Sequence, residues 1–201
     1  MKKVSLFLLG ISLALVGNAE IRVLSNVKLG EGFFPRFADA ETVTYLKAEN
    51  ASYLTTTVDD NAVLRVDNEN LDLNLYRNGE KVVLKPHGDA NYIWASLSPD
   101  QTMILFNTKF GTAVCDLNGK EIINVGNVNA PVWYGNDYIV GMNDQHDGYY
   151  FTSSNIVIAS VDGMERQELT DAKEMGYYPD VDAKSGRIVY HTEKGQIRLM
   201  Q

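Results

Sequence analysis

Three turn glycines recur at nearly equal intervals along the chain. Gly79, Gly119 and Gly163 are 40 and 44 residues apart, and each separates two β-rich runs. Asn-Gly between apolar runs is the strongest short-range signal of a β-hairpin. A period of about 40 residues with four strands per unit is typical of propeller blades, not of a sandwich or a helical solenoid. The spacing therefore predicts an all-β fold, a small β-propeller of four-stranded antiparallel blades.

The clearest repeat unit runs from Tyr92 to Val125. An apolar run ends at a Ser98-Pro99-Asp100 turn, and three further β-rich runs follow, the last two separated by Asn118-Gly119. Both central residues of a type I′ turn need positive φ, and we expect Asn118-Gly119 to form such a turn. The segment predicts a four-stranded meander.

Four segments begin with the same order of features: an aromatic or apolar residue, a short strand, a polar turn and a β-rich strand. Three have a proline at one position, Pro35, Pro131 and Pro179, and the fourth has Ala95 there. Pro35 and Ala95 lie 60 residues apart, so the stretch Ala51–Asn70 is surplus to the period. This surplus is either an extra hairpin or part of a fifth blade, and we predict four or five blades. Its two strand-like runs are Leu54–Val58 and Val63–Val66.

The last repeat is incomplete, because no turn and no fourth strand follow Gln196–Gln201. Strand character also precedes the first repeat, at Ile21–Leu29. We expect this N-terminal strand to complete the C-terminal blade, to close the ring of blades and so to hide both edges. No segment has apolar residues at helical spacing with a capping residue, which predicts very little helix.

The N-terminus has the layout of a secretory signal peptide. Lys2 and Lys3 precede an apolar run that is too short for a comfortable membrane span. We expect cleavage after Ala19, with a signal peptide at 1–19 and a single propeller domain at 20–201. The protein would then be exported, with the periplasm preferred, and the alternative is an uncleaved anchor. No later segment approaches the ~18 consecutive apolar residues of a membrane span.

The net charge argues against certain classes of binding partner, and the cysteine content argues against disulfide and thiol chemistry. Without Lys2 and Lys3 the chain has 16 basic and 26 acidic residues, a formal charge of −10. Such a surface repels phosphates, so we expect no nucleic acid or anionic lipid as a partner. Cys115 is the only cysteine, which excludes an intramolecular disulfide. Its alternating run predicts a buried structural thiol in preference to a nucleophile.

Motifs of common enzymes and cofactor sites do not occur. The sequence has no Gly-x-Ser-x-Gly elbow, no CxxC, no HExxH, no EF-hand loop and no phosphate-binding glycine loop. His87, His146 and His191 are far apart in sequence, which favours ordinary surface or hydrogen-bonded histidines over a metal site. We therefore predict no catalytic residue, no metal and no cofactor.

One candidate surface is a polar stretch that lengthens the third repeat, Asn143–Gly148, followed by aromatic residues. We interpret it as a solvated loop at the rim, where propellers commonly bind partners. Its oxygen-bearing side chains are a possible Ca²⁺ site, although the spacing fits no recognised loop. The candidate rim-loop residues are Asp144, His146, Asp147, Tyr149 and Tyr150.

A second candidate surface consists of aromatic residues near the blade starts. In a ring these residues converge toward one end of the central channel and form an aromatic-lined mouth for a peptide or glycan. The competing interpretation is packing between blades, which needs large apolar residues at equivalent positions. The candidate channel-mouth residues are Arg36, Trp94, Trp133, Tyr178 and Asp180, of which Arg36 and Asp180 directly follow a repeat proline.

The run Leu97–Phe106 resembles the WD40-like (PD40) repeat of TolB-type propellers, whose blades have a Ser-Pro-Asp-Gly turn followed by an apolar strand. Tyr178–His191 is similar but weaker, and Gln101 stands where the family has glycine. The resemblance implies a bacterial, exported propeller in which the motif is structural. The chain has no room for the additional α/β domain or the six blades of TolB itself.

These features together predict a non-enzymatic exported β-propeller that acts as a protein- or peptide-binding scaffold in the bacterial cell envelope. One alternative is a carbohydrate-binding module, which exposed tyrosines in one patch would favour. The other is a propeller-type hydrolase or glycosidase that uses turn carboxylates, although aspartates that cap their own turns are far commoner. The available carboxylates are Asp39, Asp100, Asp180 and Asp182.

Overall fold

The computed structural model describes residues 2–5, 22–47, 64–120, 122–182 and 184–201. Within these ranges the chain forms strands and two short 3-10 turns, η1 (Glu69–Leu71) and η2 (Ala172–Glu174). None of the described helical segments is long and apolar enough to cross a membrane. The very low helix content that the sequence predicts is confirmed.

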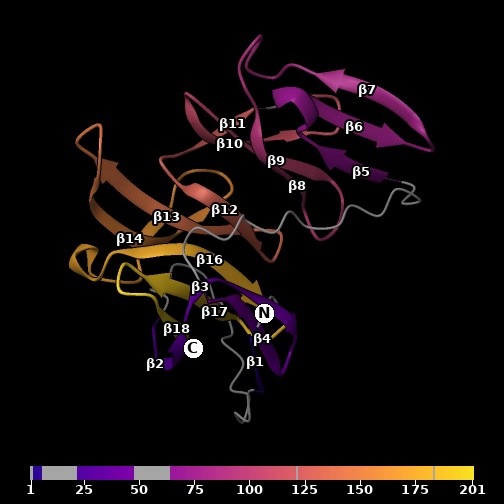
Figure 1. The fold of residues 1–201 in the computed structure, drawn as a ribbon. Helices are drawn as coiled ribbons and strands as arrows, with labels where there is room; N and C mark the ends of the chain where they lie inside the picture. The colour runs from indigo at the N-terminus through magenta and orange to yellow at the C-terminus, as the bar shows by residue number, and fades with distance from the viewer. Residues whose placement is uncertain (1, 6–21, 48–63, 121, 183) are drawn as a thin grey trace.

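Five antiparallel sheets form the blades of a small β-propeller (Figure 1). Blade 1 contains β1 (Lys2–Ser5), β4 (Thr42–Leu46) and β3 (Phe33–Asp39), in that order across the sheet. Blade 2 contains β5 (Leu64–Asp67), β6 (Leu73–Arg77) and β7 (Glu80–Leu84). Blade 3 is the predicted meander, β8 (Ile93–Leu97), β9 (Met103–Thr108), β10 (Gly111–Asp116) and β11 (Ile123–Gly126).

Blades 4 and 5 have four strands each. Blade 4 contains β12 (Asn129–Tyr134), β13 (Tyr138–His146), β14 (Phe151–Ser160) and β15 (Arg166–Glu168). Blade 5 contains β16 (Gly176–Asp182), β17 (Arg187–Thr192), β18 (Gln196–Met200) and β2 (Asn26–Glu31). The N-terminal strand β2 pairs antiparallel with β18, with Asn26 opposite Met200, so the predicted closure of the C-terminal blade is confirmed.

The surplus stretch contributes a strand to a separate blade. The predicted run Val63–Val66 corresponds to β5, which pairs with β6, while Leu54–Val58 lies outside the described residues. The described chain therefore has five blades, of which the first two have three strands instead of the expected four. Packing between neighbours runs from blade 1 to blades 5, 4, 3 and 2, so blades 1 and 2 lie at the two ends of the series (Figure 1). The predicted closure of the ring is therefore wrong for the described residues, because β2 completes blade 5 without bringing blade 1 to blade 2.

Four innermost strands begin with the same β-bulge. The bulge residues that precede the repeat Pro or Ala have left-handed φ values of 52° at Phe34, 52° at Trp94, 45° at Ala130 and 48° at Tyr178. A proline that follows loses no ladder hydrogen bond, because the bulge has already interrupted the pairing. The shared geometry explains why the sequence repeats at these positions.

The Asn-Gly prediction is wrong for Asn118-Gly119. Only Gly119 has positive φ there, and its N–H donates to the Asp116 carbonyl in a turn that the Asp116 carboxylate caps. A type I′ turn occurs instead at Asn78-Gly79, where φ is 53° and 82° between the paired residues Arg77 and Glu80.

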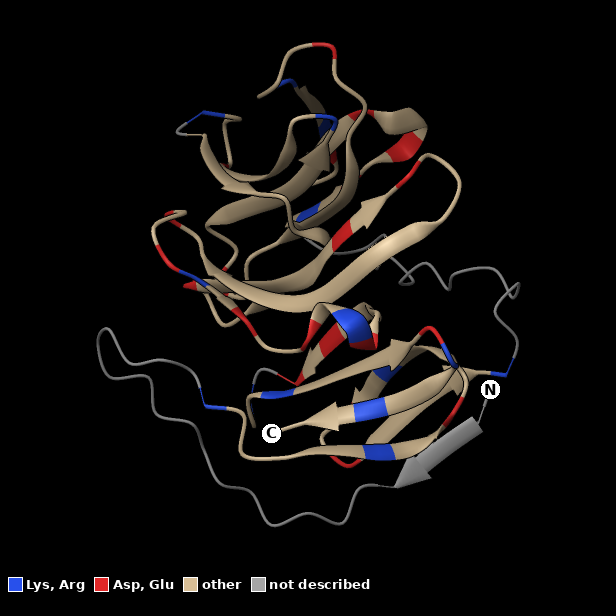
Figure 2. Ribbon diagram, turned by 90° about the vertical axis from the view of Figure 1, so that its left-hand side faces the viewer, with Lys and Arg blue, Asp and Glu red and all other residues tan. Residues whose placement is uncertain are grey.

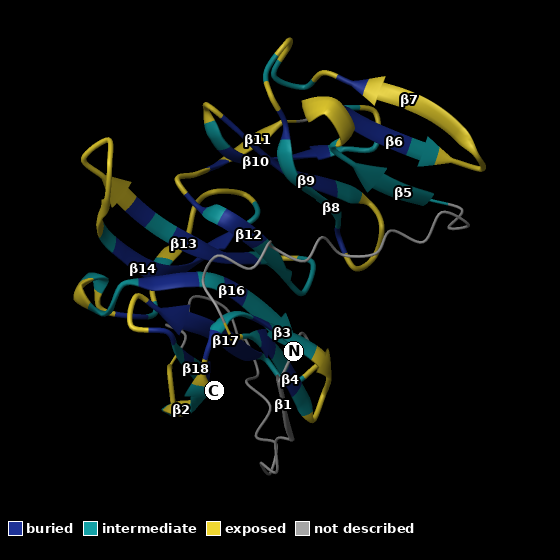
Figure 3. Ribbon diagram, viewed as in Figure 1, coloured by how far each residue is buried: buried dark blue, intermediate teal, exposed yellow. Residues whose placement is uncertain are grey.

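The core lies along the middle strands of the blades, and β7 is mostly exposed (Figure 3). Cys115 is buried in β10, as predicted. Burial raises the pKa of its thiol to about 12, so the thiol stays protonated at neutral pH. Acidic side chains are spread over the loops of all parts of the molecule (Figure 2).

Replacing Gln101 by glycine should stabilise the protein. Gln101 has φ of 59° in the Ser98-Pro99-Asp100 turn, and this conformation costs an L-residue about 1–2 kcal/mol. Glycine relieves this strain, but it also raises the conformational entropy of the unfolded chain, which offsets part of the gain. We therefore expect the free energy of unfolding to rise by about 1 kcal/mol. Urea denaturation measures the change. Lys109→Gly, in a turn position without positive φ, should be destabilising, and equal effects of both changes would contradict the prediction.

Candidate binding site

A cavity of about 290 Å³ lies where blades 1, 4 and 5 meet. The starts of β3 and β16, the end of β17 and the hairpin between β13 and β14 surround it. Six of its nine described lining residues are phenylalanine or tyrosine. The lining residues are Phe33, Phe34, Tyr150, Phe151, Tyr177, Tyr178, His191, Thr192 and Glu193.

Strand pairing brings these residues together. The antiparallel register of β16 and β17 places Tyr177 opposite His191 and Gly176 opposite Thr192. The bulge at Tyr178 re-aims that side chain, and the equivalent bulge at Phe34 does the same on the neighbouring blade. The two rings meet edge to face, with centroids 4.9 Å apart.

His191 lies at the base of the cavity, ringed by aromatic side chains. Its ring centroid is 5.2 Å from that of Phe34, 5.4 Å from that of Phe33, 5.7 Å from that of Tyr177 and 5.8 Å from that of Tyr178. The Phe34 backbone N–H donates to Nδ1 at 3.3 Å, so the neutral ring has its proton on Nε2. Burial lowers the pKa of His191 to about 4, and the imidazole is therefore uncharged at neutral pH.

The hairpin between β13 and β14 carries exposed aromatic residues over the cavity. The Asp147 carboxylate accepts hydrogen bonds from the N–H groups of Tyr150 and Tyr149, both at 2.8 Å, and these bonds hold its pKa below the usual value. The side chains of Tyr149 and Tyr150 are 91% and 77% exposed. His146 also stabilises the turn, because its Nδ1 accepts a hydrogen bond from the Gly148 N–H.

The rim loop is shorter than predicted. Residues Asn143–His146 belong to β13 and continue its pairing with β14, so only the residues around Asp147 form the turn. Asp144 is buried and accepts a hydrogen bond from the Asn129 amide at 2.8 Å. Our placement of Asp144 in a solvated loop is therefore wrong, because strand pairing extends further than its polar sequence suggests.

The channel-mouth candidates divide into three groups. Tyr178 lines the cavity together with the rim residue Tyr150, so the two predicted surfaces meet there. Trp94 packs against the core cluster that Tyr178 also contacts, but it does not line the cavity. Trp133 is three residues beyond the bulge residue Ala130, and it packs instead against the cluster that contains residues of blade 3. The expected convergence of Trp133 with the blade-start aromatics does not occur.

Arg36 and Asp180 form an ion pair between blades 1 and 5, with Nη1 and Oδ1 3.8 Å apart. Arg36 also donates to the Pro179 carbonyl at 3.4 Å, and Asp180 accepts from the Phe37 N–H at 2.8 Å. Burial raises the pKa of the Asp180 carboxyl, and the Arg36 guanidinium offsets only part of this effect. These two residues position β3 against β16.

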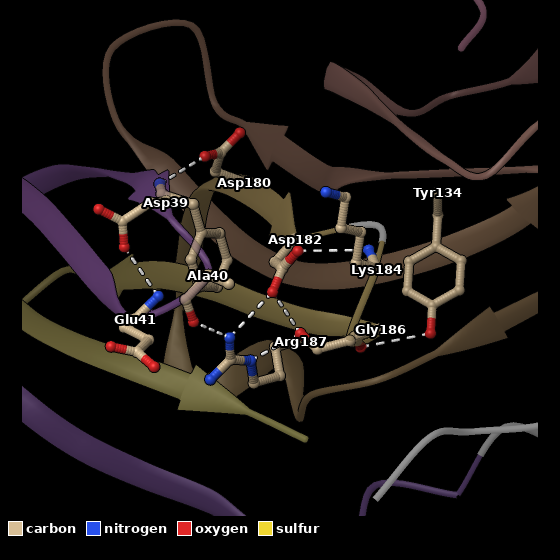
Figure 4. A network of polar contacts seen from close by, with 11 residues as sticks. Asp39, Ala40, Glu41, Tyr134, Asp180, Asp182, Lys184, Gly186 and Arg187 are labelled. Atoms are coloured by element: carbon tan, nitrogen blue, oxygen red, sulfur yellow. Dashed lines mark hydrogen bonds and ion pairs between the residues drawn. The ribbon is translucent and has the colours of Figure 1, made fainter. Parts of the chain in front are cut away.

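A second polar network lies at the opposite end of β16 (Figure 4). The Arg187 guanidinium pairs with Asp182 at 2.9 Å and donates to the Ala40 carbonyl of blade 1. Ser185 donates to Asp182 and accepts from Arg187 Nε. The Tyr134 hydroxyl of blade 4 donates to a carbonyl of the same turn at 3.3 Å. The network therefore joins three consecutive blades.

The turn carboxylates that would serve a hydrolase are occupied by structural contacts. Asp100 accepts from Ser98 Oγ at 2.6 Å and from Thr102, and Asp39 accepts from the Glu41 N–H at 2.8 Å. Asp180 and Asp182 have the ion pairs described above. Among the described residues no group of three or more His, Cys, Asp or Glu side chains has an arrangement that could hold a metal ion.

Sequence reasoning did not select His191, Thr192 or Glu193 as site residues. They follow the apolar run of β17 and have no motif of their own. The signal that could have found them is the strand register, since β17 must pair with β16 and so brings its last residues beside Tyr177. The bulge shifts this register, which sequence alone does not show.

The fold and the cavity define a β-propeller with an aromatic pocket at the junction of three blades. No family model matches the chain, and no curated protein shows a significant match. Among solved structures, the chain is similar to the tricorn protease, with 15% identity over 59% of this chain and 13% of that chain and a TM-score of 0.49. It is also similar to an ancestral GH74 enzyme, with 13% identity over 61% of this chain and 19% of that chain and a TM-score of 0.43. The matches thus cover less than a fifth of either protein.

Proposed function

We propose that the protein is a non-enzymatic β-propeller scaffold of the bacterial cell envelope that binds a protein or peptide in the aromatic pocket. The observation that carries this proposal is the group of aromatic rings at one blade junction, with Tyr149, Tyr150 and Phe151 reaching solvent on a stiff hairpin. Clustered exposed aromatics are the commonest anchors of protein recognition. The signal-like N-terminus and the TolB-like turn at Leu97–Phe106 support export to the envelope.

A carbohydrate-binding module is the second candidate, because Tyr149 and Tyr150 are consecutive exposed tyrosines and Tyr150 lines the pocket. Tyrosine faces also stack on sugar rings. The two candidates differ in the ligand that the pocket binds, a protein or peptide in the first and a carbohydrate in the second. The same pocket variants therefore test both.

A cross-linking pull-down from native envelopes tests the scaffold function. Arg36 and Asp180 are unsuitable positions for the variant, since their ion pair joins two blades. Tyr150→Ala changes an exposed pocket residue, and Phe110→Ala removes an aromatic ring of blade 3 that is 61% exposed and does not line the pocket. We expect a specific partner that the Tyr150 variant loses roughly 5-fold or more, while the Phe110 variant retains it. A partner that both variants retain, or none at all, would refute this use of the pocket.

A further inference from the structure

We infer that the pocket binds a positively charged side chain, lysine or arginine, of a partner peptide. The inference rests on the proposed function and adds the chemical class of the group that enters the pocket. Three observations support it: the charge of the lining, the density of aromatic rings and the size of the cavity.

Among the lining residues that the structure describes, one is charged at neutral pH, and it is an acid. Glu193 is exposed at the edge of the pocket, and no ion pair or side-chain hydrogen bond holds its carboxylate among the described residues. Lys194 follows it in sequence but does not line the pocket. His191 is enclosed by four rings and uncharged. The whole chain has a formal net charge of −8. A cation is therefore attracted by the protein as a whole at a distance and by the Glu193 carboxylate at the pocket.

The aromatic rings favour a cation independently of Glu193. The faces of phenylalanine and tyrosine rings carry partial negative charge, and a cation within about 6 Å of a ring centroid gains roughly 0.5–2 kcal/mol. The chain already contains this interaction elsewhere, because the Arg65 guanidinium lies 3.5 Å from the centroid of the Tyr76 ring. In the pocket, Tyr150 and Tyr178 come from different blades, so an entering side chain is flanked by rings on more than one side.

Size and polarity argue against a sugar as the main ligand. A cavity of about 290 Å³ is at the small end of ligand pockets, which suits one side chain better than several sugar rings. Sugar hydroxyls need several free hydrogen-bonding partners. Thr192 Oγ1 already accepts from the Gln196 N–H, and His191 Nδ1 already accepts from the Phe34 N–H. The Glu193 carboxylate is the acidic group left at the edge of the pocket, and one carboxylate matches one ammonium or guanidinium group better than the many hydroxyls of an oligosaccharide.

Two matched peptides test the inference. The probes are a blocked Gly-Ser-Lys-Ser-Gly peptide and the same peptide with norleucine, which has the methylene chain without the charge. Binding to the full chain, which includes strand β1 of blade 1, is measured by NMR titration at low and high salt. We expect the lysine peptide to bind roughly tenfold more tightly than the norleucine peptide, with the preference reduced by salt. The shifted resonances should include those of Tyr150, Thr192 and Glu193.

Two glutamate variants provide the matched control. Glu193→Gln keeps the shape of the side chain and should lower the affinity for the lysine peptide about 3-fold. Glu80→Gln makes the same charge change on the exposed strand β7, away from the pocket, and should leave the affinity unchanged. An equal loss in both variants would show that only the net charge matters and would overturn the inference.

The outcomes separate this inference from the proposed function. Equal binding of the lysine and norleucine peptides at the pocket overturns the cation preference and leaves peptide binding intact. Binding of neither peptide, together with shifts at the same residues on addition of maltotetraose, overturns both and supports the carbohydrate-binding alternative. Binding of none of the three probes at these residues refutes the pocket as a ligand site.

Discussion

Replacing Arg187 by alanine is expected to lower the free energy of unfolding by about 3–5 kcal/mol, which is the usual cost of leaving one partner of a buried ion pair alone. The side chains of Arg187 and Asp182 are 8% and 10% exposed, so the remaining carboxylate is largely buried and keeps the Ser185 hydroxyl and the Lys184 N–H as donors but no cation. The change also removes the donor to the Ala40 carbonyl of blade 1 and the contact with Ser185. Because small domains have a total stability of about 5–15 kcal/mol, this loss is severe.

Urea denaturation of three variants checks this prediction. Lys184→Ala removes an exposed cation from the same turn and should change stability by less than about 0.5 kcal/mol. The double change Arg187→Met, Asp182→Leu removes both charges together, and we expect it to recover part of the loss, because no unpaired charge stays buried. An Arg187→Ala protein with nearly normal stability would show that the network does not hold the blades together.

Stability should also fall as the pH drops from about 6.5 to about 4, because of His191. The folded-state pKa of His191 is about 4, below the ordinary value of 6.5, since burial among aromatic rings disfavours the imidazolium. Between these two values the unfolded chain binds the proton and the folded protein does not. The stability present above pH 6.5 is thus lost as the pH falls, by roughly 3 kcal/mol in total.

The measurement is the free energy of unfolding at several pH values between 7 and 4, compared with variants. Carboxylates titrate in the same range, so the informative quantity is the difference in slope between proteins. His191→Phe should have the shallower slope, even though it loses the hydrogen bond from Phe34 and is less stable at every pH. His146→Gln removes an exposed histidine and should keep the full slope. An unchanged slope in His191→Phe would contradict the assignment.

The blade starts were predictable because they depend on local chemistry. Proline cannot donate to a ladder, so its recurrence at Pro35, Pro131 and Pro179 marks a break in pairing, and the structure has a β-bulge at each place. Ala95 occupies the equivalent position without a proline. The repeat in the sequence is therefore a repeat of backbone geometry. The extension of pairing through Asp144 was not predictable from the same signals, because its amide partner Asn129 lies on another strand, β12.

The pocket was only half predictable, because it depends on contacts between blades. Tyr178 and Tyr150 were identified separately, but nothing in their spacing shows that a long hairpin folds back over the blade start. One pairing was within reach of sequence reasoning. Arg36 and Asp180 follow equivalent prolines, and equivalent positions on adjacent blades lie side by side, so their opposite charges predict the ion pair that the structure shows. That prediction needs the knowledge that blades 1 and 5 are neighbours.

The pairing of β2 with β18 has a consequence for the order in which the protein is made. Asn26 emerges from the ribosome early, and its partner Met200 emerges about 170 residues later. Until then β2 has an unpaired edge, because its partner strand β18 has not been synthesised. Long-range β pairing of this kind is slow. Blade 5 can be completed only after residues 196–200 have been synthesised. An unfinished chain therefore lacks a complete fifth blade, whatever the state of its other blades.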